Sequence, residues 1–579
     1  MPRGDWLVAA AVAAIVLAPY ATLRLPFRVA LEAQAAAILA VVLALLATGL
    51  VSAGWRRRMG AVPGTIVAGL LAYVLAALLG AVVGLARGND PRLLAGQLLA
   101  MGLLPLGAAA GLILPGPPSW RGLVCGVTSA AGAAATFHLA LGIDLALRGR
   151  ELYRLMLPNS VAPIGSSALA IVLLAALVGH VGRRLRWAGG VAIGLMGVFA
   201  VVTEVRSMWL TLILGMTIIR VRQRGWRALF TRTVRIWGAA AIGLAVVSAL
   251  GVEAWWRLPR PNLLPDPGSA SAPHLDSLSV PVPPLPPSRR FTWAAGTAPE
   301  ALQLTRFFPV NGGCGYRLRA LTATSGGGKG SVAVVWIGAD GGYLGMLATS
   351  VPPRFGGPTI VSAGRAPARA VRAYLRVDWL PGATGTCSME DVTLVELRPA
   401  PLISLHEVER EFLSRLASML PIEHPADDLA HLSIAYRAEE TRVLVDLFAA
   451  SDWVARLFGQ GLGARYHLGA IAVEEMGSED VNYIHDFYLF VLVKLGLVGL
   501  ALVGAGLAAC VGWTWRAASG LAPGPARSFL IAAAAIWIAF ALWSVVAPQI
   551  NSFRIAPVLG LLLAASVRCA EPGSPAASA

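Results

Sequence analysis

Long apolar segments alternate with short polar connections along the chain, and one polar region interrupts this pattern. A membrane-spanning helix needs about 20 mostly apolar residues. By this rule the pattern predicts about twelve spans, at residues 6–23, 30–54, 61–86, 93–115, 121–147, 166–182, 187–205, 207–221, 234–255, 486–513, 527–547 and 553–568. No small-residue cleavage site follows the first apolar segment, so we expect an uncleaved span there rather than a signal peptide.

The composition agrees with this pattern. Of the 579 residues, 56% are hydrophobic and only 13% are charged, which is typical of a polytopic membrane protein. The formal net charge is +16, and in a soluble protein it would suggest a nucleic-acid partner. Here arginines in short loops between spans account for it, so we expect the lipid bilayer, and no nucleic acid, as a partner.

Arginine clusters predict the orientation of the spans. Residues 56–58, 183–186 and 220–235 are rich in arginine, and each cluster follows an even-numbered span. The positive-inside rule places these loops in the cytoplasm. Both termini, including a tail at 569–579, are then cytoplasmic, and residues 256–484 lie outside.

This outer region divides into three parts between the membrane helices of 1–255 and those of 485–568. Residues 256–290 are rich in proline and predict an extended linker. Residues 291–398 contain short alternating runs separated by Gly, Pro and Asp, which predict a β-sandwich of roughly 100 residues. Its last strand, "DVTLVEL", resembles that of jelly-roll carbohydrate-binding modules; a spacer or interaction domain is the alternative. Residues 399–484 have helical periodicity.

Cysteine usage adds one expectation. Cys314 and Cys387 both fall in the β-rich region, and a disulfide between them is expected if that region is exported. The cysteine and histidine spacing does not suggest zinc, and we expect neither a metal nor a cofactor.

Two segments place arginines where an anion could bind. Glu204 and Arg206 lie in a very short connection between two predicted spans, so they form either an ion pair at the membrane interface or part of an anion site. Arg437 and Arg442 lie in "YRAEETRVLVDL". Glu440 follows Arg437 by one helical turn and can pair with it, whereas Arg442 should face elsewhere. The sequence does not decide between these two arginines.

His485 begins a predicted span and is followed by Asp486. An imidazole can accept a proton from a hydroxyl at neutral pH, and Asp486, Glu479 or Asp480 could orient the ring. The alternative is an interfacial histidine that caps the helix. The nearby "GQGLGA" is not a phosphate-binding loop motif, and we expect a turn that allows close packing.

Three segments, in this order, are similar to the O-antigen ligase and O-antigen polymerase superfamily. They are "TEVRSMWL", "YRAEETRVLVDL…LFGQGLGARY" and "YIHDFYLFVLVKLGLVGL". The resemblance extends over roughly residues 187–567, apart from the β-rich insertion. It implies an all-α fold of the membrane glycosyltransferase C type, in the bacterial inner membrane, with its active site on the exterior side.

The resemblance also implies the chemistry. The donor would be a glycan on undecaprenyl diphosphate, and the acceptor a lipid A core, a protein or a growing glycan. Arg206 and Arg437, or Arg442 in its place, would bind the diphosphate, and His485 would be the general base with Asp486 as its orienter. Glu204, Glu440, Gly461, Gly463 and Tyr466 would support the site.

Two positions depart from the family pattern. Asp486 stands where the family has asparagine, and Glu204 lies two residues before the arginine. An acid at position 486 would favour the charged form of His485 and could block the base at neutral pH unless it points away. An ion pair between Glu204 and Arg206 could neutralise the charge that the diphosphate needs.

Several functions stay open from the sequence. Ligase and polymerase share these motifs, with a slight preference for ligase. A transporter of lipid-linked glycans would explain the spans, but should show internal repeats or charges deep in several spans. A non-catalytic glycan receptor would depend on the β-rich region and not on His485.

Overall fold

The computed structural model describes most of residues 3–571 and forms two compact units. Residues outside the description are 1–2, 22–26, 53, 115–119, 148–160, 178–179, 181–182, 203–205, 225–249, 265–290, 295–300, 304, 326–329, 352–358, 380–385, 400–401, 404–405, 407–428, 469–479, 546, 548–549, 551 and 572–579. The first unit comprises 1–139, 154–237 and 415–579, and the second comprises 140–153 and 238–414.

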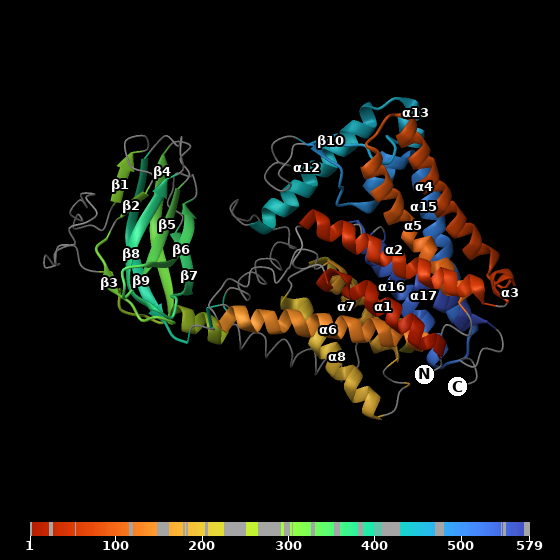
Figure 1. Cartoon of the computed structure of the whole chain (residues 1–579), viewed down its shortest axis with the longest axis horizontal. Coiled ribbons are helices and arrows are strands. Elements are labelled where there is room, and N and C mark those ends of the chain that lie inside the picture. The colour runs from red at the N-terminus through yellow and green to blue at the C-terminus, as the bar shows by residue number, and fades with distance from the viewer. Residues whose placement is uncertain are drawn as a thin grey trace. The chain divides into compact units, whose positions relative to one another are not determined.

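The first unit is helical (Figure 1). Its helices are α1 (Arg3–Ala21), α2 (Phe27–Val51), α3 (Trp55–Gly60), α4 (Gly64–Ala86), α5 (Pro91–Ile113), α6 (Trp120–Leu147), α7 (Val161–Leu177), α8 (Arg183–Val202), α9 (Arg206–Arg224), α12 (Leu429–Ala450), α13 (Trp453–Phe458), α15 (Phe487–Gly520), α16 (Pro525–Trp543) and α17 (Ala556–Ala570). The C-terminal end of α6 belongs to the second unit. A two-stranded ladder of β10 (Tyr466–His467) and β11 (Asp480–Val481) precedes α15.

Six of the described helices are long and apolar enough to cross a membrane. They contain Glu32–Val51, Gly64–Ala86, Pro91–Ile113, Trp120–Asp144, Phe487–Gly520 and Pro525–Trp543. Four further predicted spans correspond to shorter apolar helices, Trp6–Ala18, Ile164–Leu177, Arg186–Phe199 and Ala556–Ala570. The span expected at 207–221 coincides with α9, and most of the one at 234–255 lies outside the described residues. The chain is therefore a mostly helical protein with membrane-spanning character.

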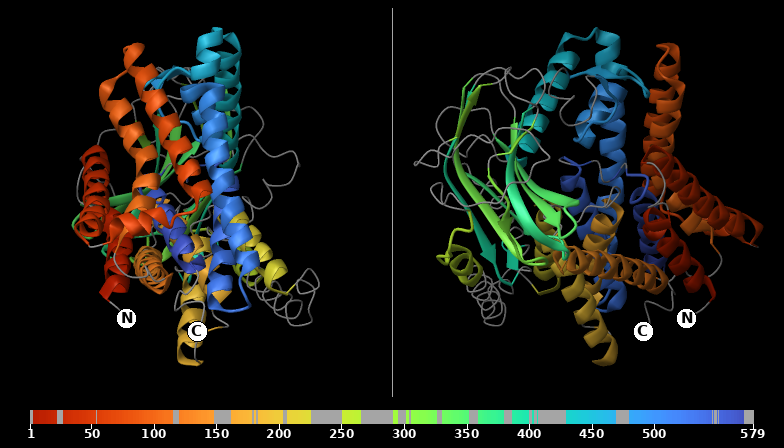
Figure 2. Two further views of the ribbon diagram at one scale, coloured as in Figure 1. Left: turned by 90° about the vertical axis from the view of Figure 1, so that its right-hand side faces the viewer. Right: turned by 60° about the vertical axis from the view of Figure 1, so that its left-hand side comes forward.

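Glycines allow helices of the first unit to approach closely. Views from two sides show α4 and α15 side by side (Figure 2). A Cβ on Gly69 of α4 would lie 3.0 Å from the carbonyl oxygen of Gly506 on α15, and one on Gly107 of α5 would lie 2.5 Å from that of Pro557 on α17. Small residues at such crossings let helix backbones pack without intervening side chains.

Helix α15 is interrupted at Gly496, whose φ is +70°. The break frees backbone carbonyls that a membrane interior could not hydrate. The loop after α13 provides their partners, because the N–H groups of Gln460 and Gly461 donate to the carbonyl oxygens of Val493 (2.8 Å) and Lys494 (2.9 Å). The glycine-rich loop is thus part of the helix packing.

The second unit contains a separate β-sheet region. Its strands are β1 (Phe291–Ala294), β2 (Ala301–Gln303), β3 (Phe308–Pro309), β4 (Gly315–Ser325), β5 (Gly330–Gly338), β6 (Tyr343–Val351), β7 (Thr359–Arg365), β8 (Ala370–Trp379) and β9 (Thr386–Leu397). One antiparallel sheet has the order β1-β9-β4-β7, and the other β2-β8-β5-β6 with β3 also paired to β8. Alternate residues of both sheets form one hydrophobic cluster, which includes Leu318, Val334, Leu375 and Leu394.

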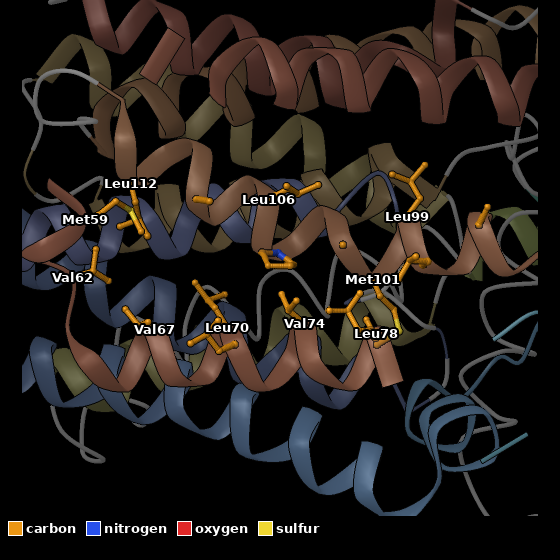
Figure 3. A pocket seen from close by; sticks show the side chains of 17 residues that line it. Met59, Val62, Val67, Leu70, Val74, Leu78, Leu99, Met101, Leu106 and Leu112 are labelled. Carbon is orange, nitrogen blue, oxygen red and sulfur yellow. The ribbon is translucent and has the colours of Figure 1, made fainter. Parts of the chain in front are cut away.

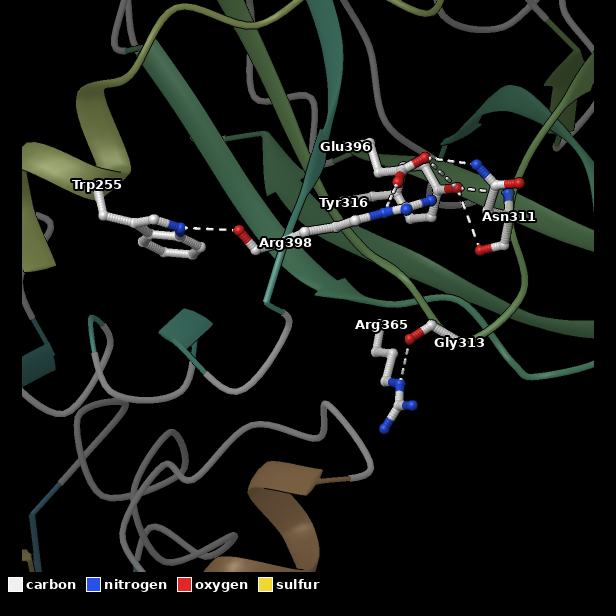
Figure 4. Close-up of polar contacts among 7 residues, drawn as sticks. All are labelled: Trp255, Asn311, Gly313, Tyr316, Arg365, Glu396 and Arg398. Atoms are coloured by element: carbon white, nitrogen blue, oxygen red, sulfur yellow. Dashed lines mark hydrogen bonds and ion pairs between the residues drawn. The ribbon is translucent and has the colours of Figure 1, made fainter.

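Two tryptophans join this region to the segments that flank it. The indole N–H of Trp255, in the helical segment 250–257, donates to the carbonyl oxygen of Arg398 just after β9 (3.0 Å; Figure 4). The ring of Trp256 stacks on His406, with centroids 4.1 Å apart. Figure 4 also shows Glu396, which accepts a hydrogen bond from the amide of Asn311 (2.8 Å) and pairs with Arg398. The entry and exit of the β-sheet region are therefore held together.

The expected disulfide is wrong. The residue after Cys314, Gly315, pairs with Leu397, whereas Cys387 pairs with Thr324 at the other end of the same two strands. Ten residues of extended strand separate Cys314 from Thr324, about 33 Å, and a disulfide needs Cα atoms within roughly 7 Å. Cys314 has a free thiol.

Candidate functional site

His485 lies at the start of α15 and contacts a buried carboxylate of α12. Its ring nitrogen Nδ1 is 3.2 Å from each carboxylate oxygen of Glu440. Its backbone N–H also donates to Oε2 of Glu440, at 3.2 Å. The side chain of Glu440 is 1% exposed and that of His485 is 17% exposed, so the carboxylate is enclosed while the imidazole keeps access to solvent.

The periodicity of α12 explains why Glu440 is enclosed. Tyr436, Glu440 and Leu444 are four residues apart and all buried, so they form one stripe along the helix. The rings of Tyr436 and Tyr483 meet the imidazole edge-on, with centroids 5.5 Å and 5.0 Å away. These contacts fix both the position and the plane of the His485 ring.

The pairing determines which nitrogen of His485 can react. An ionised carboxylate only accepts hydrogen bonds, so Nδ1 must carry the proton that it donates to Glu440. In this tautomer Nε2 has a free lone pair and can accept a proton. A buried carboxylate that orients an imidazole in this way also stabilises the imidazolium that forms.

Asp486 has a different role from the one its sequence position suggested. Its carboxylate caps α15 by accepting the N–H groups of Tyr488 (2.7 Å) and Leu489 (3.0 Å). Burial raises the pKa of Asp486, and these two hydrogen bonds oppose the rise. Of the other proposed orienters, Asp480 lies 3.2 Å from Nδ1 of His467, and Glu479 is outside the described residues. The carboxylate beside His485 is that of Glu440, which sequence reasoning had placed in a supporting role.

The two arginines of α12 differ in their surroundings. Arg442 has a side chain that is 63% exposed and pairs with Asp446 at 3.5 Å, and its Nε donates to Glu439 at 2.9 Å. Arg437 is partly buried, one helical turn before Glu440. Burial raises the pKa of Tyr483 to about 12, and the positive charge of Arg437 acts against this rise. Of the two arginines of α12, Arg437 is therefore the one whose charge acts on Tyr483, the ring that contacts His485.

The remaining predicted residues lie apart from this pair or outside the description. Arg206 begins α9, but its side chain and all of Glu204 fall outside the described part of the chain. The N–H of Gly461 donates to Lys494, and that of Gly463 donates to Oε1 of Gln97 at 2.8 Å. Both N–H groups are therefore used to hold the loop and not to bind a phosphate. Tyr466 packs under the Lys494 ammonium, with Nζ 4.5 Å from the ring centroid.

Sequence reasoning missed three polar residues that hold the surrounding helices and the glycine-rich loop together. Gln97 of α5 bridges two segments, because its Nε2 also donates to the carbonyl of Asn482 (3.2 Å). Asn89 donates to the carbonyls of Gln460 (2.9 Å) and Leu462 (3.0 Å). Arg554 is buried and its Nε donates to Gln34 of α2 at 3.0 Å. In the sequence, each of them is only a polar residue near the end of an apolar segment, and this position does not reveal its partner.

The described site joins an oriented imidazole to a buried carboxylate, with arginine charge nearby. Such a group can remove a proton from a hydroxyl, and guanidinium groups can bind an anion. No protein-family model matches this chain, and neither does any curated protein sequence.

Proposed function

We propose that the chain is an inverting, metal-independent glycan transferase of the O-antigen ligase and polymerase superfamily. It moves a glycan from undecaprenyl diphosphate to an acceptor hydroxyl at the outer face of the bacterial inner membrane. On this proposal the helices form about twelve spans of the C-type glycosyltransferase arrangement, and the β-sheet region is an exported β-sandwich. The observation that carries the proposal is the His485–Glu440 pair at the start of an apolar helix.

The reaction would be a single displacement. Nε2 of His485 takes the proton of the acceptor hydroxyl as that oxygen bonds to the anomeric carbon. The bond from this carbon to the diphosphate oxygen breaks, and its electron pair leaves with undecaprenyl diphosphate. Arg437, together with Arg206, offsets the charge of the leaving group. A positioned base of this kind contributes on the order of 10²–10⁴-fold.

An apolar cavity in the first unit supports a lipid-linked donor. A cavity of about 650 Å³ lies between α4 and α5, within the usual size of ligand pockets. Its lining side chains are apolar, as Figure 3 shows for Leu70 and Val74 of α4 and Met101 and Leu106 of α5. Such a surface suits a hydrocarbon chain and excludes a sugar. We assign it to the isoprenoid tail of the donor.

Turnover of a lipid-linked glycan tests the proposal. Purified protein in lipid nanodiscs is given undecaprenyl-diphosphate-linked glycan and a hydroxyl acceptor, and released undecaprenyl diphosphate is measured. His485→Ala should reduce release by at least about 100-fold while donor binding persists. His467→Ala is the matched control, because His467 also faces a carboxylate at 3.2 Å but is exposed. Normal turnover by His485→Ala would remove the assigned base, whereas absence of turnover by wild type with every acceptor would favour a transporter or receptor.

The acceptor distinguishes ligase from polymerase. Transfer to a lipid A core or a protein is the reaction of a ligase, whereas elongation on the lipid carrier is that of a polymerase. We favour the ligase on the similarity of "YIHD" and the glycine-rich segment. Analysing the products made with each acceptor decides between them.

A further inference from the structure

The two outward faces of the β-sheet region differ. On the sheet β1-β9-β4-β7, outward-facing Ala363, Val395 and Leu397 form an apolar cluster with Ile403, and Trp255 and Trp256 pack against it. This face is used for attachment to the flanking segments. On the other sheet the outward side chains include exposed aromatic and charged groups, which lie over the fully buried Ala333 and Val335 of β5.

Strand β8 carries the central row of this second face. Ala373 and Leu375 point into the core, so Arg372, Tyr374 and Arg376 point outward by the alternation of a strand. Successive outward side chains are about 6–7 Å apart along the strand. A tyrosine ring is thus flanked by a guanidinium group on each side.

Neighbouring strands extend this row across the sheet. Val335 of β5 pairs with both Tyr374 and Met346, and Arg376 pairs with Gln303 of β2. Nη2 of Arg376 reaches Sδ of Met346 at 3.7 Å. Because directly paired residues share a face, these side chains form one continuous surface.

Aromatic rings lie at two further points of this surface. Phe307, next to β3, meets the Tyr374 ring edge-on, with centroids 5.2 Å apart. It is 38% exposed, and Tyr343 at the β6 side is 61% exposed. Large aromatic side chains are usually buried, so exposed ones beside arginines indicate a binding surface.

The chemistry of these groups selects a ligand. Aromatic rings stack on the apolar faces of sugar rings, and guanidinium groups bind carboxylates with two parallel hydrogen bonds. We propose that the surface formed by Gln303, Phe307, Tyr343, Met346, Arg372, Tyr374 and Arg376 binds an anionic glycan. The choice of a glycan over other anionic polymers rests on the proposed function.

Binding of defined hexasaccharides to the full-length protein in nanodiscs tests this inference. The probes are hexamers of galacturonate and of mannuronate, with maltohexaose as a neutral sugar and hexaglutamate as an anion without sugar. We expect a uronate hexamer to bind at least tenfold more tightly than either control probe. Arg372→Glu should weaken this binding at least tenfold, because it reverses one charge of the surface.

Two matched variants separate this surface from general effects. Arg319→Glu makes the same charge change at an exposed residue of β4, on the outward face of the other sheet, and should alter binding less than twofold. Tyr374→Phe keeps the ring and should retain binding, whereas Tyr374→Ala should lose it. If Tyr374→Ala does not fold, Tyr343→Ala at the exposed edge takes its place, with an expected loss of at least threefold.

Several results would overturn the inference. They are failure of both uronate hexamers to bind, equal binding of maltohexaose or hexaglutamate, and equal losses in Arg319→Glu and Arg372→Glu. A change from dimer to monomer in Arg372→Glu without any effect on sugar binding would instead make this face an interface between copies. His485→Ala should bind the hexamers normally, so a failed turnover experiment and a failed binding experiment remain distinguishable.

Discussion

Nδ1 of His485 lies 3.2 Å from both carboxylate oxygens of Glu440, although 45 residues separate them in the chain. The carboxylate is enclosed and receives the backbone N–H of the same histidine. Removing either partner would leave a buried polar group without its hydrogen bonds, which is destabilising. The pair therefore fixes the start of α15 against α12 and orients the imidazole at the same time.

The arginines of α12 should differ in their effect on the donor. Arg437→Gln removes a partly buried charge close to the site and should raise the KM for the lipid-linked donor about 10–100-fold, the effect of losing a charged hydrogen bond. Arg442→Gln removes an exposed charge already paired with Glu439 and Asp446 and should change KM less than twofold. Steady-state kinetics over a range of donor concentrations measures both. Equal effects would mean that α12 presents a different face to the donor.

The glycine-rich loop should not tolerate a side chain at Gly461. A Cβ there would lie 2.3 Å from the backbone nitrogen of Gly84, and φ is +84°. Gly461→Ala should destabilise the protein by more than about 2 kcal/mol. Gly88→Ala is the control, because Gly88 also has a positive φ, +71°, but has open space around it. This substitution should lower the free energy of unfolding by about 1 kcal/mol. Thermal unfolding in detergent compares them, and similar midpoints would show that the close approach is unimportant.

Filling the apolar cavity should weaken binding of long-chain donors only. Gly102 of α5 lines the cavity and has no atom within 4 Å of an added Cβ. Gly102→Leu should raise the KM for a full-length isoprenoid donor about tenfold, since the lost apolar burial is worth on the order of 1–2 kcal/mol. A donor with a short prenyl chain should be unaffected.

Gly96 provides the control for this cavity. It lies on the same helix with the same open surroundings but outside the lining. Gly96→Leu should leave both KM values unchanged. If the two variants behave alike, the cavity does not hold the tail.

Acid should weaken the contact between Asp90 and the glycine-rich loop. The hydrogen bond from Arg465 (3.1 Å) lowers the pKa of Asp90 below its ordinary 3.8, and the N–H of Arg92 lowers it further. The pair's contribution to stability is therefore complete above pH 3.8 and is lost as the pH falls through the lowered pKa. Asp90→Asn keeps the helix cap without the charge. The difference in thermal midpoint between wild type and this variant should be present at pH 6 and diminish below pH 3.8; a constant difference would contradict this.

The sequence predicted elements better than it predicted partners. Apolar runs such as 61–86 and 93–115 became α4 and α5, because length and hydropathy are local properties. "GQGLG" was expected to be a close-packing turn, and its glycines do lie against α4, the start of α5 and α15.

The pairing of His485 depends instead on tertiary structure. Periodicity could place Arg437 and Glu440 on one side of a helix, but not show which segment that side meets. Proximity in sequence favoured Asp486, whose carboxylate is used by the helix N-terminus. The disulfide failed for a similar reason, since strand register separates Cys314 from Cys387.

The central claim is that Glu440, and not Asp486, orients His485 for proton removal. The most direct measurement is undecaprenyl diphosphate release by wild type, Glu440→Gln and Asp486→Asn in the same nanodiscs, with thermal midpoints recorded for each. Asparagine still caps a helix, so Asp486→Asn should retain turnover within about threefold. Glu440→Gln keeps the shape but removes the charge and should lower kcat at least about tenfold, with the KM for the donor nearly unchanged. Normal turnover in Glu440→Gln, together with a large loss in Asp486→Asn, would contradict this account.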